Sequence, residues 1–101
     1  MAVTKVIRYR TKAECADENQ RLIGCVFAEL AEEKPEGLRY AAFRLEDGVS
    51  FLHVATIEGG VNPLQASTAF AEFQSDIHNR IDEGPVAGDA SIVGSYRAFA
   101  D

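Results

Sequence analysis

Residues 38–57 read LRYAAFRLEDGVSFLHVATI, and this stretch predicts a β-hairpin whose register follows from the sequence itself. Asp47-Gly48 separates two runs of strand-forming residues, and Asp-Gly is a strong signal for a two-residue type I′ turn. Such a turn needs φ > 0 at both residues, which Gly accepts freely and Asp tolerates. The cross-strand pairs that this loop aligns are Glu46 with Val49, Arg44 with Phe51, Ala42 with His53 and Tyr40 with Ala55.

The hairpin has two faces of different character, because side chains alternate along a strand. One face is almost purely apolar and holds Ala41, Phe43, Leu45, Leu52 and Val54. The other mixes aromatic rings, a cation and an imidazole, as a binding cavity would, and it holds Tyr40, Ala42, Arg44, Phe51, His53 and Ala55. The second face is therefore where a search for function begins.

The rest of the chain supplies two helices and two more strands. Residues 3–10 alternate like a strand, residues 16–34 carry apolar side chains at helical spacing, and residues 64–81 carry a narrower apolar stripe. Residues 58–63 and 82–88 have loop composition, and residues 89–99 are predicted to form the last strand. The order β-α-β-β-α-β predicts an α+β, ferredoxin-like single domain over residues 1–101, with a four-stranded antiparallel sheet and both helices on one face.

This one-sided arrangement leaves one face of the sheet uncovered. The helices are expected to cover the apolar face with Phe43 and Leu52, so the face with Tyr40 and His53 would be bare. A bare sheet face that carries large aromatic residues is usually covered by a ligand or by another subunit. Two such sheets facing each other form a closed dimer, and we therefore expect a homodimer.

Composition excludes several classes of partner. The net charge is −6 and the ten basic residues are scattered, which argues against nucleic acid. No apolar run approaches the roughly 18 residues that span a bilayer, and no signal peptide is visible, so we expect no membrane partner and a cytoplasmic protein. Cys15 and Cys25 match neither a redox nor a zinc spacing. His78 with Asp82 has no evident third ligand, so no metal site is predicted.

Five segments of the chain resemble a known family over nearly its whole length. They are VIRYR at 6–10, the helix at 18–33, GLRY at 37–40, FLHVA at 51–55 and FAEFQ at 70–74. Together they resemble the antibiotic-biosynthesis-monooxygenase-like (ABM-like) group of the dimeric α/β-barrel superfamily. The resemblance implies a homodimer with a ligand cavity in each subunit. Its characterised members include cofactor-independent monooxygenases of anthrones and quinols, haem-degrading enzymes, isomerases and decarboxylases.

The haem-degrading branch fits this chain poorly. That branch relies on an Asn, a Trp and a His, whereas this chain has no Trp and its first predicted strand has no Asn. The resemblance therefore favours a monooxygenase-like enzyme without a cofactor that acts on a small aromatic substrate. The alternative is a non-catalytic small-molecule-binding or stress-related dimer of the same fold.

His53, Arg44 and Tyr40 are the candidate catalytic residues. An imidazole can deprotonate an acidic phenol or anthrone carbon, and the resulting electron-rich anion can react with dioxygen. Arg44 and Tyr40 are candidates for holding the developing oxyanion. The alternative is that these side chains are hydrogen-bonded at the dimer seam, which would deprive His53 of a free nitrogen. Candidate residues of the substrate pocket are Phe51, Asn62, Phe70 and Phe73, although the last two also fit a helix core and Asn62 also fits a plain turn.

Overall fold

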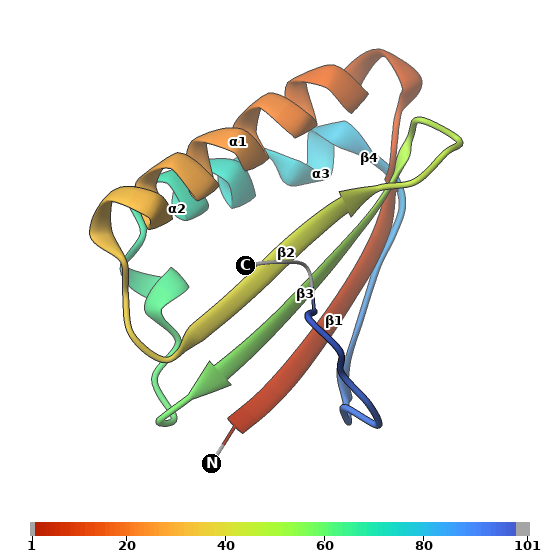
Figure 1. Ribbon diagram of the computed structural model, residues 1–101. Coiled ribbons are helices and arrows are strands. Elements are labelled where there is room, and N and C mark those ends of the chain that lie inside the picture. Colours follow the sequence, from red (N-terminus) through yellow and green to blue (C-terminus); the bar gives the residue numbers. More distant parts are fainter. Residues whose placement is uncertain (1, 99–101) are drawn as a thin grey trace.

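Helices cover one face of a four-stranded antiparallel sheet in the computed structural model, which describes residues 2–98 (Figure 1). The sheet order is β2-β3-β1-β4. The strands are β1 (Ala2–Thr11), β2 (Leu38–Arg44), β3 (Ser50–Glu58) and β4 (Ile81–Ala90). The helices are α1 (Ala16–Glu33), α2 (Thr68–Ser75) and α3 (Ile77–Arg80), with short 3-10 helices η1 (Ala13–Cys15) and η2 (Pro63–Ala66). The predicted α+β, ferredoxin-like fold class is confirmed.

The β2–β3 hairpin has the predicted register but not the predicted turn. Arg44 pairs with Phe51, Ala42 with His53 and Tyr40 with Ala55. Gly48 has a positive φ of 80° while Asp47 does not, so the type I′ turn is wrong.

The observed loop is longer than the predicted one and is held together by Asp47. The Leu45 N–H donates to the Ser50 carbonyl at 2.9 Å, which closes a loop over residues 46–49. The Asp47 carboxylate accepts the backbone N–H groups of Val49 and Ser50 at 2.9 and 2.8 Å. The observed and the predicted loops align the same cross-strand pairs of residues. The predicted register is therefore correct although the predicted turn type is wrong.

Helix α1 follows the prediction closely. Its buried stripe includes Leu22, Ile23 and Val26, at the spacing that places side chains on one helix face. The helix ends where Lys34 adopts a left-handed conformation (φ 48°) and donates its N–H to the Leu30 carbonyl at 2.8 Å. This end points the chain back toward the sheet, where β2 begins at Leu38.

The predicted helix over residues 64–81 is wrong in detail, because the segment is divided into η2, α2 and α3. Ser67 is extended (φ −84°, ψ 122°), and its hydroxyl oxygen accepts the Phe70 N–H at 3.0 Å as an N-cap. Glu29 on α1 reinforces this cap: its carboxylate accepts the Ser67 hydroxyl and the Ala69 N–H, the latter at 3.1 Å. Glu29 thus fastens the start of α2 to α1.

The last strand lies earlier than predicted. Strand β4 covers Ile81–Ala90 and pairs with β1, whereas residues 82–88 were expected to be a loop and residues 89–99 a strand. Gly84-Pro85 suggested a turn, but β4 is an edge strand, where the missing N–H of Pro is tolerated. The register shifts between Arg8 and Arg10, opposite this Gly-Pro pair. Residues 91–98 form no strand, and Phe99 lies outside the described residues.

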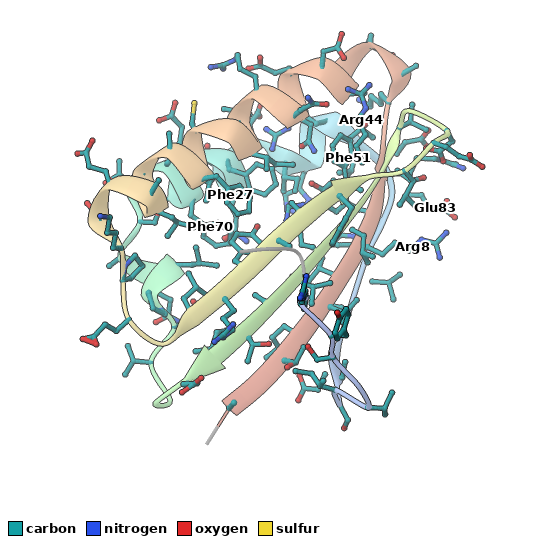
Figure 2. The ribbon with its side chains drawn as sticks, in the orientation of Figure 1. Arg8, Phe27, Arg44, Phe51, Phe70 and Glu83 are labelled. Carbon is teal, nitrogen blue, oxygen red and sulfur yellow. The ribbon has the colours of Figure 1, made fainter. Side chains whose placement is uncertain are left out.

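The helices cover the opposite face of the sheet from the one predicted. Phe51 and His53 are 1% and 5% exposed beneath the helices, whereas Leu52 and Val54 are half-buried on the open face. Figure 2 shows Phe51 between the helices and the sheet, and Arg8 on the other side. The mixed face is the buried one because its polar groups find hydrogen-bond partners there, as described below. The apolar face is the one that the helices leave uncovered, and the segment after β4 lies against part of it, where Ile92 and Gly94 line a hollow together with Val54.

Candidate functional site

His53, in the middle of β3, is held between two tyrosine hydroxyls inside one subunit. Its Nε2 lies 2.8 Å from the Tyr9 Oη and its Nδ1 lies 2.6 Å from the Tyr40 Oη. Tyr9 comes from β1 and Tyr40 from β2, the two strands that flank β3. Both imidazole nitrogens are therefore occupied, and the partners belong to the same chain rather than to a dimer seam.

The hydrogen bonds continue from Tyr9 into the helical layer. The Asn19 Nδ2 donates to the Tyr9 Oη at 2.9 Å, and the Arg80 Nε donates to the Asn19 Oδ1 at 3.0 Å. A second guanidinium nitrogen of Arg80 donates to the Phe73 carbonyl at 2.6 Å. We call the series Arg80–Asn19–Tyr9–His53–Tyr40 the buried polar chain. Its first four members are at most 5% exposed, and Tyr40 is half-buried.

Local sequence patterns explain how these side chains meet. Tyr9 pairs with Phe51 across the sheet, two positions from His53, so that both side chains lie on the helix-covered face. Asn19 stands one turn before Leu22 and Ile23 on the buried stripe of α1. Arg80 is the last residue of α3 and is buried beneath the helices.

Burial keeps the three ring side chains of the buried polar chain, His53, Tyr9 and Tyr40, neutral around pH 7. It lowers the pKa of His53 to about 4. It raises the pKa of Tyr9 to about 12, against the opposing effects of the Asn19 hydrogen bond and the Arg80 charge. Burial also raises the pKa of Tyr40, and the nearby Tyr9 adds to this effect. The three rings therefore act as neutral hydrogen-bond donors and acceptors.

Aromatic rings surround the buried polar chain. The Phe73 ring centroid lies 5.8 Å from that of His53, and the Phe51 ring stacks on Tyr9 at 5.7 Å. The Arg80 guanidinium lies over the Phe73 ring at 5.2 Å, a cation–π contact. In such surroundings each hydrogen bond is stronger than it would be in water.

A pocket of about 320 Å³ borders the buried polar chain at Tyr40. It lies between the C-terminal half of α1 and the start of β2, and its lining is mostly apolar: Phe27, Leu30, Ala31, Lys34, Pro35, Leu38 and Tyr40. The Phe27 and Tyr40 ring centroids are 4.7 Å apart. This volume is at the lower end of the range for small-molecule sites. Two larger hollows, of about 670 and 740 Å³, involve the open face of the sheet. Tyr9 borders the first and Tyr40 the second, whereas Arg80, Asn19 and His53 border neither.

The structure brings only part of the predicted catalytic set together. Tyr40 contacts His53, but Arg44 does not reach it. Arg44 lies at the exposed end of the hairpin, where its guanidinium donates to the Asp17 and Gln20 side chains at 3.1 and 2.7 Å. Its guanidinium lies over the Phe51 ring at 5.7 Å and turns to α1 rather than to His53, which the alternation of the strand alone could not indicate.

The predicted pocket residues are also divided. Phe51 and Phe73 are buried in the core around His53, and the half-buried Phe70 stacks on Phe73 at 6.2 Å; Figure 2 shows Phe70 beneath the helices. Asn62 accepts the Leu64 N–H at 2.9 Å and caps η2, so it has the local role of a turn residue. None of these four lines the pocket beside Tyr40.

Sequence reasoning missed Asn19 and Arg80. Asn19 did carry a signal: it is a polar residue on the apolar stripe of a helix, where it needs a buried partner. Arg80 carried none, because the sequence predicted one continuous helix over residues 64–81, whereas the structure divides this segment and places Arg80 at the end of α3.

Comparisons with known proteins identify the fold. No family model and no curated protein matches the chain. Among solved structures it is similar to Rv0793 from Mycobacterium tuberculosis (10% identity, TM-score 0.75, covering 94% of this chain and 98% of that one). It is also similar to SnoaB, a cofactor-independent oxygenase from Streptomyces nogalater (16%, TM-score 0.67, 93% and 95%), and to an antibiotic biosynthesis monooxygenase (18%, TM-score 0.62, 93% and 100%). The fold is thus the one predicted from the resemblance to ABM-like proteins.

Residues 2–98 contain no group of three or more His, Cys, Asp or Glu side chains placed to hold a metal ion. Within the same residues, no helix combines the length and the apolar character needed to cross a bilayer.

Proposed function

We propose that this chain is a cofactor-independent monooxygenase-like enzyme that acts on a small aromatic substrate of the quinol or anthrone type. The observation that carries the proposal is the Tyr40–His53–Tyr9 arrangement in an aromatic interior, bordered at Tyr40 by an apolar pocket. The similarity of fold to SnoaB, described as a cofactor-independent oxygenase, supports it.

The chemistry requires the protein to favour an electron-rich anion of the substrate. The apolar wall with Phe27 and Leu30 holds the rings, and Tyr40 hydrogen-bonds to the substrate oxygen as negative charge develops on it. The proton that the substrate loses when the anion forms is transferred to water. For an anthrone, the anion then reduces dioxygen: two hydrogens leave the methylene carbon, one oxygen atom enters as a carbonyl and the other leaves as water. His53 acts through Tyr40 as a positioning residue in this scheme, rather than as the free base expected from sequence.

Oxygen uptake tests the proposal. With an anthrone as substrate, Tyr40→Phe should lower kcat/KM on the order of 100-fold, because it removes one preorganised donor. Tyr96→Phe is the matched control, since Tyr96 is 82% exposed and should leave uptake unchanged. Uptake that is equal in wild type and Tyr40→Phe would contradict the assignment of the site.

A second candidate function, binding without turnover, has one observation in its favour. Both nitrogens of His53 are hydrogen-bonded and burial lowers its pKa to about 4, so no free base faces the pocket. A binding protein would retain anthrones and quinols with no oxygen uptake above the rate in buffer.

We also propose that the chain forms a homodimer through the open face of its sheet. This face holds the half-buried Leu52 and Val54, and the segment after β4 exposes 64% of Ile92 and 99% of Val93. Apolar surface of this kind is usually covered. Sedimentation equilibrium should give twice the chain mass, and Val54→Lys should give the monomer mass. Val61→Lys, in the exposed loop after β3, is the control that should remain dimeric.

A further inference from the structure

Arg80 determines which way the Asn19 amide faces. Every nitrogen of a guanidinium donates and none accepts, so the Asn19 atom 3.0 Å from the Arg80 Nε must be the amide oxygen. The amide nitrogen of Asn19 then faces the Tyr9 Oη, 2.9 Å away, and donates to it. Rotating the amide by half a turn would place two donors against each other.

The orientation of Asn19 in turn determines where the Tyr9 hydroxyl hydrogen points. Its oxygen already accepts from Asn19, and within residues 2–98 its other hydrogen-bond partner is the His53 Nε2 at 2.8 Å. A buried hydroxyl without an acceptor is costly, and Tyr9 is 4% exposed. The Tyr9 hydroxyl therefore donates to the Nε2 nitrogen.

The same reasoning extends through the imidazole to Tyr40. A neutral imidazole carries one hydrogen, so an accepting Nε2 places that hydrogen on Nδ1, which donates to the Tyr40 Oη at 2.6 Å. The Tyr40 hydroxyl hydrogen is then unused, because the hydrogen bonds among the described residues give this oxygen no partner other than His53. Tyr40 is also the one of the five that lines the pocket beside α1.

We propose that Asn19 and Arg80 are positioning residues that fix the direction of the buried polar chain, that is, which partner donates in each of its hydrogen bonds. With this direction, Tyr40 donates a hydrogen bond to a ligand oxygen in the pocket beside α1. The ligand class that fits is a compact aromatic body with a carbonyl or phenolate oxygen. The ligand part of this inference rests on the proposed function, since it places the ligand at Tyr40. The direction of the chain does not depend on it.

Nitrogen-15 NMR of the imidazole measures the direction without any substrate. The chain has two histidines, and His78 is exposed, so His78→Gln leaves His53 as the single imidazole signal. We expect the hydrogen of His53 on Nδ1 and a bare Nε2 near pH 7. A hydrogen on Nε2 would overturn the inference. Apart from His78→Gln, this measurement requires no substitution.

In the His78→Gln background, Asn19→Asp should reverse the direction of the hydrogen bonds between Tyr9, His53 and Tyr40. The introduced carboxylate still accepts from Arg80 but cannot donate, so the Tyr9 hydroxyl turns to it and accepts from Nε2–H instead. His53 then carries its hydrogen on Nε2, and Tyr40 donates to Nδ1. An Nδ1–H signal that is unchanged in the folded variant would show that Asn19 does not set the direction. A purely structural role for Asn19 would not exchange the two nitrogen signals.

Matched ligands test the consequence at Tyr40. Indanone and indane share their rings, but only indanone has a carbonyl oxygen. Wild type should bind indanone about 2- to 10-fold more tightly, as one neutral hydrogen bond allows, and Asn19→Asp should lose this preference. A preference that persists in Asn19→Asp refutes the role of Tyr40 as the donor. If neither compound binds while the nitrogen signals are as expected, the ligand site of the proposed function fails and the direction of the chain stands.

Discussion

Acidification from pH 6.5 to about 4 should cost this chain about 3 kcal/mol of stability through His53 alone. Burial lowers the pKa of His53 from its ordinary 6.5 to about 4 in the folded chain. In this window the unfolded chain therefore binds a proton that the folded chain does not, and stability rises with pH. The contribution is complete above pH 6.5 and is lost as the pH falls to about 4. At about 1.4 kcal/mol per pH unit, the window corresponds to about 3 kcal/mol.

Urea unfolding between pH 7 and pH 4.5 measures this slope in three chains: wild type, His53→Gln and His78→Gln. His53→Gln is less stable at pH 7, because Gln cannot bridge the two tyrosine hydroxyls in the same way. The diagnostic quantity is therefore the dependence on pH rather than the stability at one pH. His78→Gln removes an exposed imidazole and should keep the wild-type slope.

Carboxylates contribute to acid unfolding too, and the comparison removes their effect. Hydrogen bonds to Ser50 and Val49 lower the pKa of Asp47 to about 2, so its contribution is present above its ordinary 3.8 and is lost below that value. This loss is common to all three chains and cancels in their differences. If His53→Gln kept the wild-type slope between pH 6.5 and 4.5, the account of His53 as a buried neutral base would be refuted.

Two backbone features give further predictions, both read from urea midpoints. Gly84→Ala should destabilise the chain by about 1–3 kcal/mol, because φ is +97° and the new Cβ would lie 3.1 Å from the Arg8 carbonyl oxygen. Gly88→Ala, with open space at its Cβ, is the control, and equal midpoints would show that β4 adapts. Ser67→Ala should cost about 1 kcal/mol through loss of the α2 cap, whereas the exposed Ser75→Ala should cost much less; the reverse order would exclude this cap.

The fold could be predicted from sequence where local periodicity determines it. Strand alternation around Asp47-Gly48 set the register of the hairpin regardless of turn type, and the stripe with Leu22 and Val26 located α1. Periodicity failed at Gly84-Pro85, because a Gly-Pro pair is equally compatible with a turn and with an edge strand. Only the pairing of β4 with β1 decides between them.

The candidate site could be predicted only in part, since its partners come from distant parts of the chain. The mixed character of the hairpin face suggested exposure, but His53 is buried because the Tyr9 and Tyr40 hydroxyls hydrogen-bond to its two ring nitrogens. A hydrogen-bond partner 44 residues away in sequence cannot be inferred from alternation. The sequence of one strand therefore could not predict that its polar face is buried, because the hydrogen-bond partners come from other elements.

Glu29 bears on how a ligand in the proposed pocket beside Tyr40 would exchange with solvent. Its carboxylate binds Ser67 and the Ala69 N–H, so that α1 and α2 cannot separate without breaking these hydrogen bonds. The pocket beside Tyr40 is instead bordered by Lys34 and Leu38, at either end of the turn between α1 and β2. If the proposed site binds a ligand there, its association and dissociation are expected to depend on this short turn. Stiffening it should slow both rates together and leave the equilibrium affinity nearly unchanged.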